Sequence, residues 1–132
     1  MVRQFVYLPT FDSQLKELDL DIDDTRFIEA ILLSNPSLGR VVTGTGGVRK
    51  CRIPLHNNKG KSGGARVVYV DFVFAEKIYM LGIFSKNMKD NLSRSERNQL
   101  KSLVHKLESE LRKGDKLERV FREHQKKLRG SN

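Results

Sequence analysis

The sequence lacks several features that would assign it to a familiar class. It has a single cysteine, Cys51, and no tryptophan among its 132 residues. One cysteine excludes an internal disulfide and a cysteine-based metal cluster. Uncharged apolar stretches such as residues 30–33 and 67–70 are far shorter than the about 20 residues of a membrane-spanning helix. Residues 1–8 are too short an apolar stretch for a secretory signal. We therefore expect a cytoplasmic protein with no membrane partner.

Motifs for nucleotides and metals are incomplete. Gly60-Lys61-Ser62 resembles the end of a phosphate-binding P-loop, but Leu55 stands where that motif requires its first glycine. The GTGG run at residues 44–47 lacks the third glycine of a dinucleotide fingerprint, since Arg49 occupies that position. The three histidines are scattered, and no set of carboxylates converges on the predicted strands. We expect neither a metal nor a cofactor.

Positive charge is the dominant feature that is present. The formal net charge is +9, and it is uneven: residues 1–47 carry −3, residues 48–93 carry +6 and residues 94–132 carry +6. An acidic N-terminal part and a basic remainder of the chain indicate a polyanionic partner, for which nucleic acid is the first candidate. A basic surface that serves only solubility remains an alternative, as does an anionic membrane, which the lack of a strongly amphipathic segment disfavours.

Two periodicities predict an α+β fold. Runs rich in β-branched and aromatic residues predict strands at residues 3–8, 49–53, 65–74 and 78–85. Apolar residues spaced by three and four predict two helices between the first two strands and a further helix after Ser93. Because the consecutive strands have short links, we expect a small antiparallel sheet with two N-terminal helices and one or two C-terminal helices.

Capping residues predict where the helices begin and end. Asp23 or Asp24 is expected to cap the second helix, and Ser93 with Glu96 has the form of a capping box. Lys113-Gly114 has the form of a C-terminal stop. We therefore expect one domain over residues 1–113, with residues 114–132 as a basic helical extension of the same domain.

The basic residues cluster in the middle of the chain. Six of them fall within eighteen residues with no intervening acid: Arg49, Lys50, Arg52, Lys59, Lys61 and Arg66. Alternate side chains of a strand share a face, so Lys50 and Arg52 should point one way and Arg49 the other. A hairpin sheet would bring Lys50, Arg52, Arg66 and Lys86 to one side. Such a face suits a phosphate backbone, the alternative being a solvated face without a ligand.

Three ordered blocks resemble a known family. They are GTGGVRKCRI at residues 44–53, NKGKSGGARVVYV at residues 58–70 and IYMLGIFSKNMKDNLS at residues 78–93. Together they resemble the RelE superfamily of toxins from bacterial type II toxin–antitoxin pairs, and within it the HigB-like subgroup. The resemblance covers the middle of the chain, with a compatible order of elements on both sides.

The resemblance implies a metal-independent endoribonuclease that enters the decoding site of the 70S ribosome and cuts the messenger there by attack of a ribose 2′-hydroxyl. It implies a cognate antitoxin that covers the basic face or blocks entry to the ribosome, and contact with promoter DNA only through that antitoxin. It assigns catalysis to Lys59, Lys61, Arg66 and Lys86. The remaining basic positions, namely Arg49, Lys50, Arg52 and His56, are expected to bind RNA.

The sequence departs from that family in two ways. No tyrosine follows Lys86, whereas RelE uses a C-terminal tyrosine, so His56, Lys59 or Lys61 is the expected proton carrier. The stretch after Gly114 is longer than the family core, and we expect it to bind ribosomal RNA or the antitoxin. Two other functions remain open: a ParE-like toxin that inhibits DNA gyrase, and an RNA-binding module without catalysis.

Overall fold

The computed structural model describes residues 2–55, 64–85 and 91–130, and it is an α+β fold. The described part contains a five-stranded sheet, three α-helices and a short 3-10 turn. In chain order these are β1 (Gln4–Tyr7), α1 (Pro9–Glu17), α2 (Ile22–Ser34), β2 (Arg40–Val41), β3 (Arg49–Ile53), β4 (Ala65–Phe72), η2 (Val73–Ala75), β5 (Lys77–Ser85) and α3 (Arg94–Gly130). The expected α+β class, with two helices early in the chain and one late, is confirmed.

The sheet is mixed rather than wholly antiparallel. Its strand order is β1-β5-β4-β3-β2, and every neighbouring pair is antiparallel except β1 with β5. The antiparallel β4–β5 pair is a hairpin, as expected, whereas β1 reaches β5 only after two helices and three strands of intervening chain. Parallel pairing needs such a long connection, and no local turn signal announces it.

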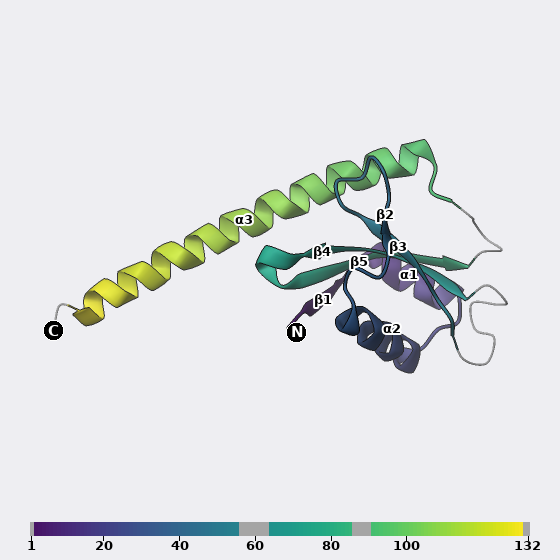
Figure 1. Ribbon diagram of the computed structural model, residues 1–132, viewed down its shortest axis with the longest axis horizontal. Coiled ribbons are helices and arrows are strands. Elements are labelled where there is room, and N and C mark those ends of the chain that lie inside the picture. The colour runs from purple at the N-terminus through teal and green to yellow at the C-terminus, as the bar shows by residue number, and fades with distance from the viewer. Residues whose placement is uncertain (1, 56–63, 86–90, 131–132) are drawn as a thin grey trace.

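The sheet lies between two layers of helix (Figure 1). On one face, α1 and α2 pack Phe11, Ile28 and Leu32 against alternate residues of β3, β4 and β5. On the other face, α3 packs Val104 against the intervening residues, among them Val68 and Phe84. The period of two along a strand thus supplies both cores, because successive side chains point to opposite faces.

Two helix starts rest on reciprocal caps. Ser93 and Glu96 form the expected capping box: the Ser93 amide donates to Glu96 Oε1 at 2.8 Å and the Glu96 amide donates to Ser93 Oγ at 3.1 Å. The cap of α2 was expected at Asp23 or Asp24 but is Asp21, whose side chain accepts from the Asp24 amide. Asp24 occupies the third helical position, and its carboxylate accepts a hydrogen bond from the Asp21 amide.

The expected helix end at Lys113-Gly114 is wrong, since α3 continues through Gly114 to Gly130. An interior glycine costs a helix only about 1 kcal/mol, and the residues on both sides are strong helix formers. Ion pairs lie on either side of it, Glu110 with Lys113 at 3.9 Å and Asp115 with Arg119 at 2.6 Å. No helix of the described residues is long and apolar enough to cross a membrane.

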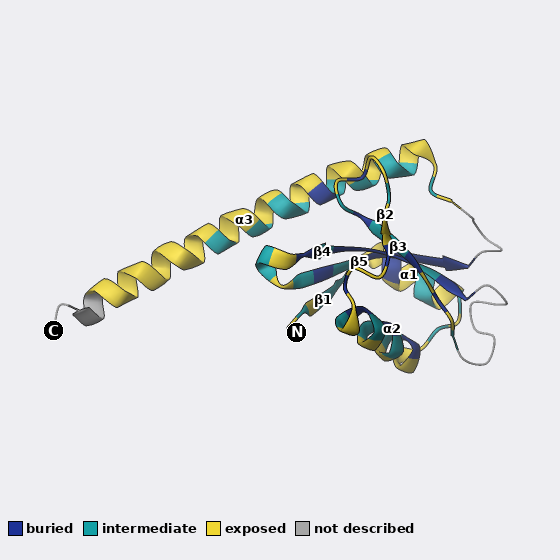
Figure 2. Ribbon diagram, viewed as in Figure 1, coloured by how far each residue is buried: buried dark blue, intermediate teal, exposed yellow. Residues whose placement is uncertain are grey.

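The second half of α3 extends beyond the sheet (Figure 1). Before that half begins, Arg112 contacts the turn after β4, with its guanidinium carbon 4.2 Å from the centre of the Phe74 ring. Every described side chain from Lys116 to Lys127 is exposed (Figure 2). A helix in this position has no packed face of its own, although helices usually derive their stability from such packing.

Candidate nucleic-acid interface

Four cations lie on the α3 side of the sheet, in two rows that cross the strands. In the first row Arg40 of β2 pairs with Lys50 of β3, which pairs with Val68 of β4. In the second row Arg52 of β3 pairs with Arg66 of β4. We call Arg40, Lys50, Arg52 and Arg66 the cationic patch.

The face of the patch follows from its partners. Val68 belongs to the core beneath α3, and so does Phe84, the partner of Arg66 on β5. Directly opposite residues of an antiparallel pair point to the same side of the sheet. Lys50, Arg52 and Arg66 therefore share the α3 side, which is the grouping that the sequence pattern predicted for these three.

Arg40 was missed by the sequence analysis. Its strand β2 has only two residues, Arg40 and Val41, which is too short for any periodicity to register. Gly39, just before it, allows the close approach of β2 to β3, since a Cβ atom there would lie 3.0 Å from the Lys50 carbonyl group. The sequence signal that could have indicated Arg40 is its position directly after Gly39.

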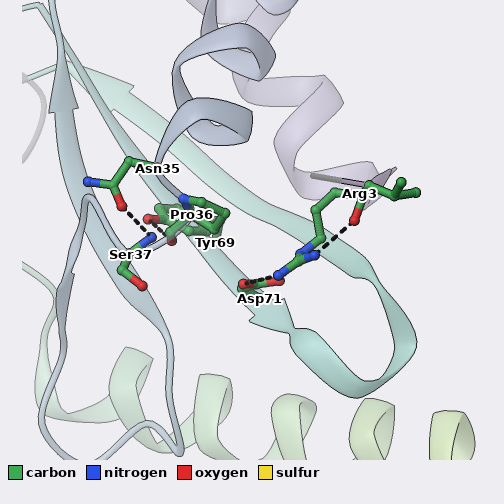
Figure 3. A network of polar contacts seen from close by, with 7 residues as sticks. Arg3, Asn35, Pro36, Ser37, Tyr69 and Asp71 are labelled. Atoms are coloured by element: carbon green, nitrogen blue, oxygen red, sulfur yellow. Dashed lines mark hydrogen bonds and ion pairs between the residues drawn. The ribbon is translucent and has the colours of Figure 1, made fainter.

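Arg49 lies on the opposite side from the patch. It pairs with Tyr69, and its Nη1 donates to the Gly39 carbonyl at 2.7 Å and to the Ser37 carbonyl at 3.4 Å. The Tyr69 hydroxyl donates to the Pro36 carbonyl at 2.8 Å (Figure 3). It also accepts from the Gly39 amide at 3.0 Å. Arg49 thus holds the segment before β2, and a contact between Arg49 and RNA stays a prediction.

A glycine-rich turn connects β2 to β3 over residues 42–48, and a threonine organises it. Thr45 is fully buried, and its Oγ1 donates to the Val42 carbonyl at 2.6 Å and accepts from the Val48 amide at 3.1 Å. Gly44, Gly46 and Gly47 have positive φ angles, a region that favours glycine. The turn leads into β3, where Arg49 pairs with Tyr69 and Lys50 with Val68.

The first turns of α3 approach the patch. Lys50 Nζ lies 3.2 Å from Asn91 Oδ1, a contact that links β3 to the segment before the helix. The remaining predicted site residues, His56, Lys59, Lys61 and Lys86, lie outside the described residues. Their assigned roles in catalysis and RNA binding stay predictions.

The three tyrosines and Cys51 are buried or partly buried within the fold. The Tyr7 hydroxyl donates to Glu29 on the α1 and α2 side, and burial raises the pKa of Tyr7. Burial also raises the pKa of Tyr69. Tyr79 packs edge-on against Phe72 with 5.5 Å between ring centres. Cys51 is 8% exposed and burial raises its pKa to about 11, so it is a protonated thiol at neutral pH.

The patch therefore supplies positive charge and hydrogen-bond donors rather than a nucleophile. Arg52 and Arg66 carry planar guanidinium groups that match phosphate oxygens in pairs. Among the described residues, no three His, Cys, Asp or Glu side chains gather as metal ligands would. What the arrangement can do chemically is to hold a phosphodiester and stabilise negative charge that develops on it.

The fold and this face define a small basic α+β protein with a cationic sheet surface. The sequence model of one family, the RelE toxin of the RelE / RelB toxin-antitoxin system, matches residues 11–127. The chain therefore belongs to the RelE toxin family. The Escherichia coli toxin RelE, solved in the free state as a double arginine-to-alanine mutant, is similar with 15% sequence identity and a TM-score of 0.46. That match covers 68% of this chain and 90% of the other.

Family membership gives the protein its general role as the toxin of a toxin–antitoxin pair, with an antitoxin as partner. The HigB-like subgroup stays a prediction.

Proposed function

We propose that this protein is a ribosome-dependent messenger endoribonuclease that needs no metal. The observation that supports the proposal is the pairing of Arg52 with Arg66 on the α3 side of the sheet, flanked by Lys50 and Arg40. Family membership supports a toxin role, and a phosphodiester is the substrate that a paired guanidinium site fits best.

The proposed reaction cleaves RNA within the chain. The 2′-oxygen attacks the adjacent phosphorus and forms an O2′–P bond, while the P–O5′ bond breaks. The 2′-hydroxyl proton goes to a base and the departing 5′-oxygen receives a proton, which leaves a 2′,3′-cyclic phosphate and a 5′-hydroxyl. The transition state gathers negative charge on the phosphoryl oxygens, where Arg66 and Arg52 stabilise it.

Proton transfer is proposed for residues beyond the described part of the chain. Lys59, Lys61 and His56 are the proton carriers, and Lys86 adds a donor beside the phosphate. A lysine needs a depressed pKa to act as a base, and neighbouring positive charge supplies that depression. Tyr7 and Tyr69 are engaged in hydrogen bonds elsewhere, so orientation of the messenger in the ribosomal decoding site provides the rest of the rate.

The test compares Arg66→Ala with a matched control. Arg26 is an exposed arginine on α2, on the far side of the sheet, and Arg26→Ala removes the same charge away from the patch. Each variant is expressed in bacteria with a translated and an untranslated copy of one messenger, and new 5′ ends are mapped. We expect cuts only in the translated copy, a loss of roughly 10²–10³-fold with Arg66→Ala, and full activity with Arg26→Ala.

Other outcomes would select other functions. Toxicity without RNA cuts, accompanied by inhibition of DNA gyrase, would replace the ribonuclease with a gyrase-directed toxin. RNA binding that Arg66→Ala weakens, without any cut by the wild type, would leave a binding module. Equal cutting of the untranslated messenger would refute ribosome dependence.

We further propose that residues 114–132 extend the toxin domain of residues 1–113 in order to dock the antitoxin. Three large apolar side chains lie on one face of the projecting helix, with Val120 and Phe121 one turn after Leu117. Leu117 is 70% exposed, Val120 57% and Phe121 61%. Isolated exposed apolar residues are ordinary, but a helical stripe of three without a packing partner marks an interaction surface.

The charge around this stripe indicates the kind of partner. Residues 115–130 hold six Lys or Arg and three Asp or Glu. Two of the acids are already paired within the helix, Asp115 with Arg119 and Glu118 with Arg122. An amphipathic helix with acidic flanks is complementary to this surface, and we assign it to the antitoxin rather than to ribosomal RNA. A partner held there also obstructs entry to the ribosome.

Binding to the cognate antitoxin tests this surface. We expect Leu117→Ser with Phe121→Ser to weaken the complex by at least about tenfold, and Lys126→Ser, an exposed change on the opposite face of the helix, to leave it within about twofold. Unchanged antitoxin affinity would refute the assignment. Unchanged affinity together with loss of toxin self-association would assign the stripe to a second copy of the chain.

A further inference from the structure

A cavity adjoins the cationic patch on the same side of the sheet. It has a volume of about 380 Å³ and lies between α1, the end of β5 and the first turns of α3. Apolar side chains form most of its lining, including Phe84, Leu100 and Leu103. Polar groups are few: Thr10, Gln14, Glu96 and Gln99. Small-ligand sites commonly have this composition, an apolar slot with a few polar groups that fix orientation.

The strand β5 explains why the cavity exists. β1 pairs with β5 only as far as Met80, so the rest of β5 has no strand on that edge. Gln14 of α1 covers part of it, and its Oε1 accepts from the Ile83 amide at 2.8 Å. Gly82 contributes no side chain, and a Cβ atom there would lie 3.1 Å from Gln14 Oε1.

A β-bulge lies at the same place. Val68 pairs with Gly82 but Tyr69 pairs with Met80, so Leu81 is an extra residue in β5. Leu81 and Gly82 both line the cavity. A bulge bends its strand and increases the local twist, and bulges are frequent next to functional sites.

The two rows of the patch lead directly into this cavity. The row of Arg52 and Arg66 continues to Phe84, and the row of Arg40, Lys50 and Val68 continues to Gly82. Neighbouring strands are about 4.8 Å apart. Arg66 is therefore one strand from the cavity floor and Arg52 two strands from it. The distance suits a nucleotide, whose base and phosphate are joined through one sugar.

We propose that this cavity receives a nucleobase of the RNA strand, next to the phosphate that Arg66 holds. The inference rests on the proposed function, because it names a subsite of the same reaction. Phe84, Leu100 and Leu103 bury the faces of the base. The Glu96 carboxylate, whose Oε1 already accepts from the Ser93 amide, retains further acceptor capacity, so it favours a base that carries an amino group. Uracil, which presents carbonyl oxygens instead, is the least favoured base.

Nucleotide binding to the full-length protein tests the proposal independently of cleavage. The probes are cytidine, adenosine and uridine 3′-monophosphates, with inorganic phosphate as reference, followed by the backbone amide signals of Gly82 and Leu100. We expect the cytidine and adenosine nucleotides to shift these signals, with uridine weaker by about tenfold and phosphate silent there. Equal shifts from phosphate, or shifts confined to β3 and β4, would overturn the base site.

A matched pair of variants locates the site. Gln99 and Asn98 are both exposed on the first turns of α3, but only Gln99 lines the cavity. Gln99→Trp fills the cavity and should weaken cytidine monophosphate by at least about tenfold, while Asn98→Trp should leave it within about twofold. If Gln99→Trp binds like the wild type, the cavity is not the base site.

The two proposals fail separately. Nucleotide shifts in the cavity without messenger cleavage by the wild type would refute the ribonuclease and keep the base site. Cleavage by Gln99→Trp at the same sites and rate as the wild type would refute the base site and keep the ribonuclease.

Discussion

Arg52 and Arg66 are direct cross-strand partners of the β3–β4 ladder and point to the same side of the sheet. Like charges directly opposite one another destabilise a sheet. The first row repeats the pattern, since Arg40 pairs with Lys50. The patch therefore works against the stability of the strands that carry it, which is expected where binding rather than folding determines the residues.

Replacing Arg52 by threonine should stabilise the fold while impairing activity. We expect Arg52→Thr to raise the free energy of unfolding by roughly 0.5 kcal/mol, because a like-charge pair is removed and threonine suits a strand. Urea denaturation at low salt measures this. Arg52→Lys keeps the charge and should stay at the wild-type value. A threonine variant less stable than the wild type would show that the pair is not repulsive.

Removing the Tyr69 hydroxyl should destabilise the protein. That group joins the Pro36 carbonyl to the Gly39 amide in a buried position, so Tyr69→Phe leaves both backbone groups without this partner. We expect a loss of about 1–3 kcal/mol in urea denaturation. The control is Tyr79→Phe, whose hydroxyl has no hydrogen-bond partner among the described residues. Equal stabilities of the two variants would contradict this role for Tyr69.

Alkaline pH should destabilise the wild type partly through Cys51. Burial raises the pKa of the folded thiol from its ordinary value of 9.0 to about 11. Between those values the unfolded chain has lost the proton and the folded chain keeps it, so stability is full below pH 9 and falls as pH rises toward 11. The loss is of order 2 kcal/mol. The stability difference between the wild type and Cys51→Ala, followed over this range, isolates it. A difference independent of pH would refute it.

Gly114→Ala should stabilise α3. A Cβ atom at Gly114 would meet nothing within 4 Å, and the position is helical. Alanine loses less backbone entropy, so we expect a gain of roughly 0.5–1 kcal/mol in thermal unfolding. Gly114→Pro should interrupt the helix and weaken antitoxin binding. If the alanine variant were destabilised, residue 114 would be a helix end after all.

The sequence predicted the elements that local patterns define. Runs rich in β-branched and aromatic residues predicted β3, β4 and β5, and the Ser93–Glu96 spacing predicted the start of α3. Pairing over long separations was not predictable, because nothing near β1 specifies that it will lie parallel to β5. Gly114 was misread because a glycine stops a helix only where the chain adopts the left-handed conformation, which composition does not reveal.

The candidate site was predictable in part: the shared side of Lys50, Arg52 and Arg66 was expected, but their exact pairing was not. Alternation along residues 49–53 placed Lys50 and Arg52 together, but it did not place Arg66 opposite Arg52. That register depends on how the connection between β3 and β4 closes. Arg40 belongs to the patch because β2 pairs with β3, and a strand of two residues shows no pattern in the sequence. No sequence pattern indicated the cavity beside the patch, because the bulge at Leu81 is defined only by the pairing of β4 with β5.

Because of that bulge, β5 has one residue more than the stretch of β4 with which it pairs. A chain one residue shorter at Leu81 would run the ladder straight from Met80 to Gly82, with Met80, Ile83 and Phe84 each still on its own face. Deleting Ile83 instead would exchange the faces of every residue after it. The hollow beside the cations is therefore encoded by a count of residues, and β5 has one position where that count can change without scrambling either core.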